Sequence, residues 1–257
     1  MYPVIFIGHG SPMNAVEDND FTKGWKEIKC SIPKPKAILV ISAHWESNNS
    51  LIQANEKPAT IYDFYGFPKA LYEIIYESKG SIELANKTLK LVKDSLLDEQ
   101  RGYDHGVWSV LQVMYPEADI PVIQMSIDLK KSPKELFKIG EALKPLREEG
   151  VLILGSGNIV HNLRLASYNI AGGYDWAHKF DDFIYEKIKG RDFDAIIKYE
   201  KFGEAAKLAV PEPSHFNPLL YVLGAVDEKD EVSVYNRMNF AGSVSMTSYV
   251  FKEVKSL

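Results

Sequence analysis

Short runs of uninterrupted apolar residues recur along the chain, separated by segments with helical periodicity. The runs are too short and too uniformly apolar for surface helices, so each predicts a strand buried on both faces. They lie at VIFIG (4–8), AILVISA (37–43), PVIQMSI (121–127) and VLILGSG (151–157). Amphipathic segments, which predict helices, lie at residues 81–98, 107–115, 133–148, 176–189 and 216–224. This alternation predicts an α/β fold with a central, mostly parallel or mixed sheet flanked by helices on both faces.

The C-terminal part of the chain shows a different pattern. The segments VSVYNR (232–237) and SMTSYVF (245–251) have the alternating character of half-buried strands. They are predicted to add antiparallel strands to the sheet. Because no internal repeat, low-complexity stretch or long linker interrupts the chain, residues 1–257 are predicted to form a single domain.

The composition narrows the class of protein. With 46% hydrophobic and 25% charged residues, the chain is typical of a soluble globular protein. A net charge of −5 and a pI near 5.7 argue against nucleic acid or a membrane surface as the main partner. No apolar stretch approaches the roughly 20 residues of a membrane span, and no signal peptide precedes the first strand. The one cysteine, Cys30, excludes an intrachain disulfide framework and a cysteine-based zinc site, and it fits a reducing cytoplasm.

Histidines follow the predicted strands. His9 comes directly after the first run, His44 directly after the second, and His161 a few residues after the fourth. Ligands of open α/β sheets bind in the crevice at the carboxyl ends of the strands, so these three rings are expected to converge there. His105 and His215 each lie at the start of an amphipathic segment, from which a ring can reach the same crevice.

The histidine set favours a particular kind of metal. Neutral imidazoles without cysteine ligands suit Fe(II) or Zn(II) better than magnesium or calcium, which prefer oxygen ligands. The spacings match no compact signature such as HExxH, so the site would have to be assembled from distant loops. The sixth histidine, His178, lies within a helix among charged residues and is expected to be a bystander.

Several blocks of sequence together resemble a known family. In this order and over most of the chain, they are GHGSPMNA (8–15), SAHWES (42–47), IYDFYGFP (61–68), YDHGVWSVL (103–111), GSGNIVHNL (155–163), WAHKFDDF (176–183) and PSHFNPLLYVLGA (213–225). This set is similar to the class III extradiol ring-cleavage dioxygenases, in particular the 4,5-DOPA dioxygenase branch. The resemblance implies an enzyme that opens the ring of a catechol, such as DOPA or a related phenolic compound, with O2.

The resemblance also implies roles for the histidines. His9, His44 and His215 would hold a non-haem metal, and His161 would act as acid/base catalyst or as a fourth ligand. His105 would line the pocket for substrate and oxygen. Fe(II) is expected for activity, with Zn(II) as an alternative occupant of the purified protein.

The third metal ligand is the point where this sequence departs from other branches of the superfamily. Those branches use a carboxylate there, whereas the matching position here is His215. Glu212 and Glu46 are the carboxylates that would compete for the role.

The chemistry explains these residue types. A catechol chelates Fe(II) through two adjacent oxygens, so a three-ligand site leaves room for dioxygen as well. An imidazole with a pKa near 6.5 suits the proton transfers that ring cleavage requires, which is the work assigned to His161. Asp104 either orients a ring or caps the following helix, while Ser11 and Ser42 are candidates for hydrogen bonds to the ligand loops.

Aromatic residues offer two interpretations. The four rings of residues 61–68 form either hydrophobic core or one wall of a catechol pocket, and Trp45 and Trp108 are expected in the core. A lysine or arginine near the crevice would suit a substrate carboxylate.

Three functional classes stay open on the sequence. The first is the extradiol dioxygenase, the second a zinc hydrolase that uses the same histidines, and the third a metal-independent binding member of the superfamily. The sequence leaves open the natural substrate, the bond cleaved, and whether the protein is a monomer or a homodimer.

Overall fold

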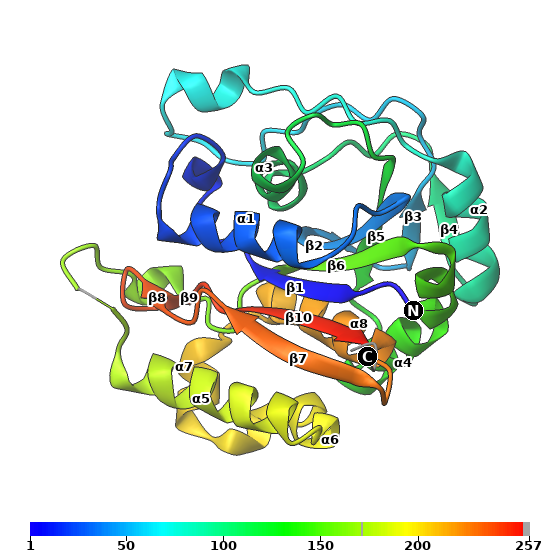
Figure 1. Cartoon of the computed structure of the whole chain (residues 1–257). Coiled ribbons are helices and arrows are strands. Elements are labelled where there is room, and N and C mark those ends of the chain that lie inside the picture. Colours follow the sequence, from blue (N-terminus) through cyan, green and yellow to red (C-terminus); the bar gives the residue numbers. More distant parts are fainter. Residues whose placement is uncertain (171, 254–257) are drawn as a thin grey trace.

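The computed structural model describes residues 1–170 and 172–253 (Figure 1). Within this part of the chain, eight strands form one mixed sheet in the order β4-β3-β5-β2-β6-β1-β10-β7. Their bounds are β1 (Val4–Gly8), β2 (Ala37–Ser47), β3 (Leu51–Gln53), β4 (Leu96–Asp98), β5 (Val122–Asp128), β6 (Val151–Gly157), β7 (Asp230–Tyr235) and β10 (Ser248–Glu253). A separate two-stranded ribbon pairs β8 (Asn239–Phe240) with β9 (Val244–Ser245).

The centre of the sheet is parallel. β2 pairs with β5 on one side and with β6 on the other, and β6 pairs with β1, all in parallel register. At the far side β10 runs antiparallel to β1, and β7 antiparallel to β10, which confirms the antiparallel C-terminal strands expected from the sequence. The carboxyl ends of β1, β2 and β6 therefore lie at one edge of the sheet.

Helices cover both faces of the sheet, as predicted. α1 and α3 pack on one face, and α4, α5 and α8 lie on the other (Figure 1). The helix bounds are α1 (Asp20–Ser31), α2 (Ile82–Leu91), α3 (His105–Met114), α4 (Pro133–Leu143), α5 (Asp175–Lys189), α6 (Phe193–Ile197), α7 (Glu204–Ala209) and α8 (Asn217–Ala225). Short 3₁₀ helices are η1 (Pro12–Ala15), η2 (Lys69–Glu73), η3 (Lys144–Glu149), η4 (Leu163–Leu165), η5 (Tyr199–Phe202) and η6 (Pro213–His215).

The central strands are buried on both faces, which explains their uninterrupted apolar sequences. In β1, Val4 and Phe6 pack with α4, α5 and α8, whereas Ile5 and Ile7 pack with α1 and α3. All four side chains are fully buried. Each such burial stabilises the fold by about 1.5–3 kcal/mol, so both cores require apolar residues at successive positions.

Several segments differ from the sequence prediction. The strand expected over 245–251 is divided between β9 and β10, and the helix expected over 133–148 ends at Leu143 and continues as η3. The helix expected over 81–98 ends at Leu91 because the next residue, Val92, adopts an extended backbone (φ −101°, ψ 105°), and the chain then enters β4. The second strand continues through Ser47, so His44 lies within β2 rather than after it. A register shift against β5 between Ile41 and Glu46 accompanies this extension.

A buried ion pair ties the end of η3 to β7. Arg147 donates to both carboxylate oxygens of Asp230, at 2.7 and 2.8 Å, and neither side chain is exposed. Arg147 also donates to the carbonyl oxygens of Tyr2 and Ala225. These bonds satisfy a charge that would otherwise destabilise the core. Among the described residues, no helix has the length and apolar character needed to cross a membrane.

Candidate metal centre

Five of the six histidines converge at the carboxyl edge of the sheet. Among the three predicted ligands, the ring centroids of His9 and His44 lie 5.0 Å apart, those of His9 and His215 5.3 Å, and those of His44 and His215 4.9 Å. His105 approaches His44 with a centroid separation of 3.9 Å. His161 stacks on His215 at 3.5 Å with an interplanar angle of 5°.

The tightest group of potential ligand atoms differs from the predicted triad. Nitrogens of His9, His44 and His105 all lie within 4.8 Å of one another, so His105 is closer to the first two histidines than the sequence suggested. No carboxylate belongs to such a group within residues 1–170 and 172–253. Glu46 and Glu212 are exposed, and Glu212 lies 3.6 Å from Arg164.

Backbone contacts at the strand ends hold the histidines in place. The His9 N–H donates to the Gly157 carbonyl at 3.0 Å, and the Asn158 N–H donates to the His215 carbonyl at 2.8 Å. Gly157 permits this approach, because a Cβ there would collide with the His215 carbonyl oxygen. The end of β6 therefore joins the His9 turn to η6, although 206 positions separate His9 from His215 in the sequence.

The Ser156 hydroxyl fixes the tautomer of His9. It lies in β6, donates to the Gly106 carbonyl oxygen, and lies 3.1 Å from Nδ1 of His9. Because its proton is already engaged, the hydroxyl can only accept from His9, so Nδ1 carries the ring proton. The Nε2 atom of His9 is then left with a free lone pair.

Asp63 likewise favours one tautomer of the His105 and His44 rings. Its carboxylate accepts the backbone N–H of His105 at 2.9 Å and lies 3.0 Å from His105 Nδ1 and 3.5 Å from His44 Nδ1. Burial raises the pKa of Asp63, but the hydrogen bonds and charge of His105 outweigh it and leave the pKa below its usual range. An ionised Asp63 favours the proton on Nδ1 of both rings, which frees their Nε2 atoms.

Two unprotonated nitrogens consequently face each other. Nε2 of His44 and Nε2 of His9 are 3.1 Å apart, and with both ring protons on Nδ1 neither nitrogen carries a hydrogen to donate. Two lone pairs at this distance repel unless a cation lies between or beside them. This arrangement fits a metal ion bound through imidazole nitrogens.

The protonation states agree with this interpretation. Burial, reinforced by the neighbouring imidazoles, lowers the pKa of His9, His44 and His215 well below the usual value. For His161, burial and to a lesser extent His105 lower the pKa to about 4. These four rings are therefore neutral at pH 7, the form in which an imidazole binds a metal or accepts a proton.

Asp104 does not cap α3 with its side chain, although it occupies the N-cap position. Its buried carboxylate instead accepts from the Ser42 hydroxyl at 2.6 Å and from Arg101 at 2.8 Å. Ser42 also accepts the His44 N–H at 3.2 Å, and Arg101 donates to the His44 carbonyl at 3.1 Å. The network holds the backbone around His44, so Asp104 acts on the strand rather than on a ring.

The five histidines open into a cavity of about 320 Å³. Phe64 and Phe67, from the predicted aromatic segment, form part of its wall, and Ser11 lines it near the His9 turn. No lysine or arginine lines this cavity in the described part of the chain, so the expected basic partner for a substrate carboxylate is not there. Trp45 and Trp108 are buried in the core, as predicted.

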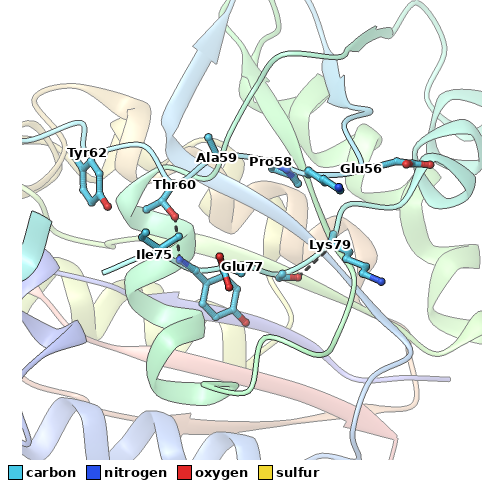
Figure 2. Close-up of a pocket in the computed structure, with 11 residues that line it drawn as sticks. Glu56, Pro58, Ala59, Thr60, Tyr62, Ile75, Glu77 and Lys79 are labelled. Carbon is cyan, nitrogen blue, oxygen red and sulfur yellow. Dashed lines mark hydrogen bonds between the residues drawn. The ribbon is translucent and has the colours of Figure 1, made fainter. Parts of the chain in front are cut away.

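The other residues singled out in the sequence lie outside this cavity. His178 is exposed on α5, and Cys30 is exposed on α1. A separate cavity of about 460 Å³ lies between residues 56–62 and 75–79 and contains no histidine. Figure 2 shows Tyr62 at one end of it and Glu56 at the other. Its walls hold no cluster of groups suited to catalysis.

Asp63 and Ser156 contact the histidines of the candidate site but were not singled out in the sequence. Asp63 is the one charged residue within IYDFYGFP, a signal that the aromatic character of the segment concealed. Ser156 belongs to VLILGSG, where it is the one hydroxyl in a buried strand. For Ser156 the available clue was a polar side chain inside a buried strand, whereas residues 61–68 around Asp63 are partly or fully exposed and offered no such clue.

Comparison with known proteins identifies the family. Residues 3–252 match the family described as the catalytic LigB subunit of aromatic ring-opening dioxygenase. The chain belongs to the LigB family. This membership confirms the resemblance found in the sequence motifs.

Individual members of the LigB family are similar over nearly their whole length. A 4,5-DOPA dioxygenase extradiol of Escherichia coli K12 is 40% identical over 253 residues, covering 96% of this chain and 93% of that protein. A 4,5-DOPA dioxygenase extradiol of Beta vulgaris is 40% identical over 255 residues, covering 96% of this chain and 95% of that protein. A crystal structure of an uncharacterized Escherichia coli K12 protein superposes with a TM-score of 0.84 at 35% identity, covering 98% of this chain and all of that one.

Proposed function

We propose that this LigB-family chain is an extradiol dioxygenase, which cleaves the aromatic ring of a catechol with O2 at a non-haem metal centre. The observation that carries the proposal is the approach of His9 Nε2 and His44 Nε2 to 3.1 Å in a cavity with aromatic walls. The names of two similar relatives support the same reaction. Residues 1–257 would act as a single catalytic domain, in a reducing cytoplasm that suits the lone exposed cysteine.

The donor set fits Fe(II) or Zn(II), with Fe(II) expected for activity. His9, His44 and His215 would hold the ion, as the family resemblance implies, and their ring centroids lie within 5.3 Å of one another. His105 is the competing third ligand, because its nitrogen lies within 4.8 Å of those of His9 and His44. Fe(II) held there would bring a catechol and O2 together and allow electrons to pass between them. His105, whose Nδ1 lies 3.0 Å from Asp63, would line the substrate and oxygen pocket beside His44.

His161 is proposed as the acid/base catalyst. It lines the cavity, and it is neutral at pH 7 with a ring nitrogen free to accept a proton from a catechol hydroxyl. Burial lowers the pKa of His161 to about 4, below the value near 6.5 assumed from the sequence, and makes it a weaker base. Its stacking on His215 at 3.5 Å fixes the plane of the ring beside the proposed ligands. Proton transfer would then make His161 positively charged, and the ring would become neutral again when it returns the proton to the product.

The cavity suits a planar aromatic substrate. Phe64 and Phe67 offer ring faces, and a volume of about 320 Å³ accommodates one aromatic ring with a short substituent. DOPA and related catechols are substrates of this size.

The decisive experiment is anaerobic reconstitution with Fe(II), followed by oxygen uptake and ring-opening absorbance on a catechol panel. We expect one O2 consumed for each ring opened and no turnover by the metal-free chain. Hydrolysis of an ester by the Zn(II)-loaded protein, without oxygen uptake by the Fe(II)-loaded protein, would overturn the proposal in favour of a zinc hydrolase.

Alanine variants separate the proposed ligands from the proton carrier. His9→Ala, His44→Ala and His215→Ala are expected to lose most of the metal and all activity. His161→Ala is expected to retain metal but to turn over about 10²–10⁴ times more slowly, the usual contribution of a positioned acid/base group. His178→Ala is the matched control, since this histidine is exposed outside the cluster. Loss of metal from His161→Ala as complete as from His9→Ala would make His161 a ligand.

A further inference from the structure

The sequence block WAHKFDDF (176–183) lies on α5, and none of its residues lines the cavity onto which the histidines open. In Figure 1, α5 lies below the β8–β9 ribbon. The two acids of the block differ in burial, since Asp181 is 5% exposed whereas Asp182 lies at the surface. A buried carboxylate requires hydrogen-bond partners, and those of Asp181 belong to the ribbon and the segment that follows it.

The Asp181 carboxylate anchors β9 to α5. Its Oδ1 atom accepts from the Ser245 hydroxyl at 2.6 Å and from the Thr247 hydroxyl at 2.8 Å. Its Oδ2 atom lies 3.5 Å from Nε of Arg237. A ribbon with two residues in each strand is not stable in isolation, so these bonds fix its place relative to the helix.

β9 in turn holds the chain on both sides of His161. The Ser245 N–H donates to the Val160 carbonyl at 2.9 Å, and the Asn162 N–H donates to the Ser243 carbonyl at 3.1 Å. His161 lies between these two bonds, in an antiparallel bridge to β9. The backbone of the proposed proton carrier is therefore fixed by the strand that α5 anchors.

Ser245 is the residue at which the two sets of bonds meet. Its hydroxyl donates to Asp181, and its carbonyl oxygen accepts from the side-chain amide of Asn158 at 2.8 Å, at the start of the His161 loop (residues 158–162). Thr247 makes the same kind of bond to Asp181, but its N–H donates to the Ser245 hydroxyl at 3.3 Å. The path from α5 to the His161 loop thus runs through Ser245.

We propose that Asp181 is a positioning residue for the proton transfer assigned to His161. Asp181 lies outside the cavity and acts through Ser245, which holds the His161 loop in place. A displacement of about 1 Å at a reacting group lowers a rate by up to about 10²-fold, so an anchor at this distance affects turnover without binding substrate. The effect on turnover rests on the proposed ring-cleavage function, whereas the connection from α5 to the His161 loop is a property of the fold.

Ser245→Ala and Thr247→Val separate this role from a general loss of stability. Each variant removes one hydroxyl that donates to Asp181, but Ser245→Ala alone breaks the bond between Asp181 and the residue that binds the His161 loop. With DOPA as substrate, Ser245→Ala is expected to lower kcat about tenfold and to leave KM and bound Fe(II) within about twofold. Thr247→Val is expected to keep kcat within about twofold, because the bond from Ser245 to Asp181 persists. Equal kcat values for the two variants would overturn the proposal.

Replacing Asp181 itself tests the carboxylate. Asp181→Ala is expected to lower kcat about 10–100-fold, and Asp181→Asn to recover most of it, because the amide oxygen can still accept from both hydroxyls. The matched control is Asp182→Ala, which removes the adjacent, exposed acid and is expected to leave kcat unchanged. In the His161→Ala background, Asp181→Ala is expected to cause less than about a twofold further loss, because both residues act on one step. An equal loss in both backgrounds would show that Asp181 does not act through His161.

Amide hydrogen exchange of the metal-free protein distinguishes failure of this proposal from failure of the proposed function. Because the Asn162 N–H bonds to β9, exchange in peptides covering residues 158–162 is expected to be about tenfold faster in Ser245→Ala than in the native protein and unchanged in Thr247→Val. If this difference is found while no catechol is cleaved, the ring-cleavage function fails and the connection from α5 to the His161 loop stands. If catechols are cleaved but exchange in Ser245→Ala equals that of the native protein, the positioning role fails alone.

Discussion

Replacing Ser156 with alanine tests whether a single hydroxyl sets the protonation of His9. In the native protein the hydroxyl accepts from His9 Nδ1 at 3.1 Å while donating to the Gly106 carbonyl. His9 is 1% exposed, so water does not replace the lost acceptor. In Ser156→Ala the ring proton is free to move to Nε2, where it can be donated to His44 Nε2, 3.1 Å away. The metal must then displace that proton in order to bind.

The size of the effect follows from the burial of His9. An unsatisfied buried donor costs about 1–3 kcal/mol. A tenfold change in affinity corresponds to about 1.4 kcal/mol, so metal affinity is expected to fall by about 10–100-fold. Titration of the metal-free protein with Zn(II) against a chromophoric chelator measures this directly.

The control for this experiment is Ser109→Ala. The Ser109 hydroxyl is also fully buried, but it has no hydrogen-bond partner among the described residues. Its removal is expected to leave metal affinity unchanged. If Ser156→Ala binds Zn(II) as tightly as the native protein, the tautomer argument and the paired lone pairs derived from it are wrong.

Three further predictions concern other parts of the chain. Asp63→Asn is expected to slow turnover by about 10–100-fold, because the amide removes the negative charge that lies 3.0 Å from His105 Nδ1 and 3.5 Å from His44 Nδ1; unaltered steady-state rates would exclude that role. Asp230→Ala leaves the charge of Arg147 buried and unpaired, so urea denaturation should show that the free energy of unfolding falls by about 3–5 kcal/mol. The double variant Arg147→Met with Asp230→Leu should recover most of this free energy. A fall below about 1 kcal/mol in Asp230→Ala would contradict the ion-pair argument. Cys30→Ala should change the turnover rate by less than about a factor of two, because this exposed thiol lies outside the histidine site. A hundredfold loss of turnover in the same assay would show that Cys30 takes part in the reaction.

The long apolar runs were sufficient to predict the central strands, because a strand buried on both faces permits few polar residues. β1 and β6 have the predicted bounds, and β5 differs by one residue at each end. β3 and β4, with three residues each, and α6, with five, were not predicted. Segments this short contain less than two full periods of any pattern, so tertiary contacts decide their conformation.

The convergence of the histidines was predictable from the sequence, but their ring protonation was not. Histidines near the carboxyl ends of parallel strands in one sheet are expected to lie close together, and the sequence placed His9 and His44 together on this ground, although β6 lies between β1 and β2. Which ring nitrogen carries the proton depends on partners distant in the chain: Ser156 lies 147 positions from His9, and Asp63 lies 42 positions from His105. Such pairings follow from sheet register and loop packing, which no local pattern encodes.

The wide separation of the histidines in the chain has a consequence for how the protein acquires its metal. No two of the five converging residues lie within 30 positions of each other, so the unfolded chain contains no local chelating motif. A metal ion would therefore bind only after β1, β2 and β6 have assembled, and its whole binding free energy would stabilise the native state. At a free metal concentration 100 times Kd this amounts to about 2.7 kcal/mol. Metal uptake by a refolding chain therefore reports that β1, β2 and β6 have assembled.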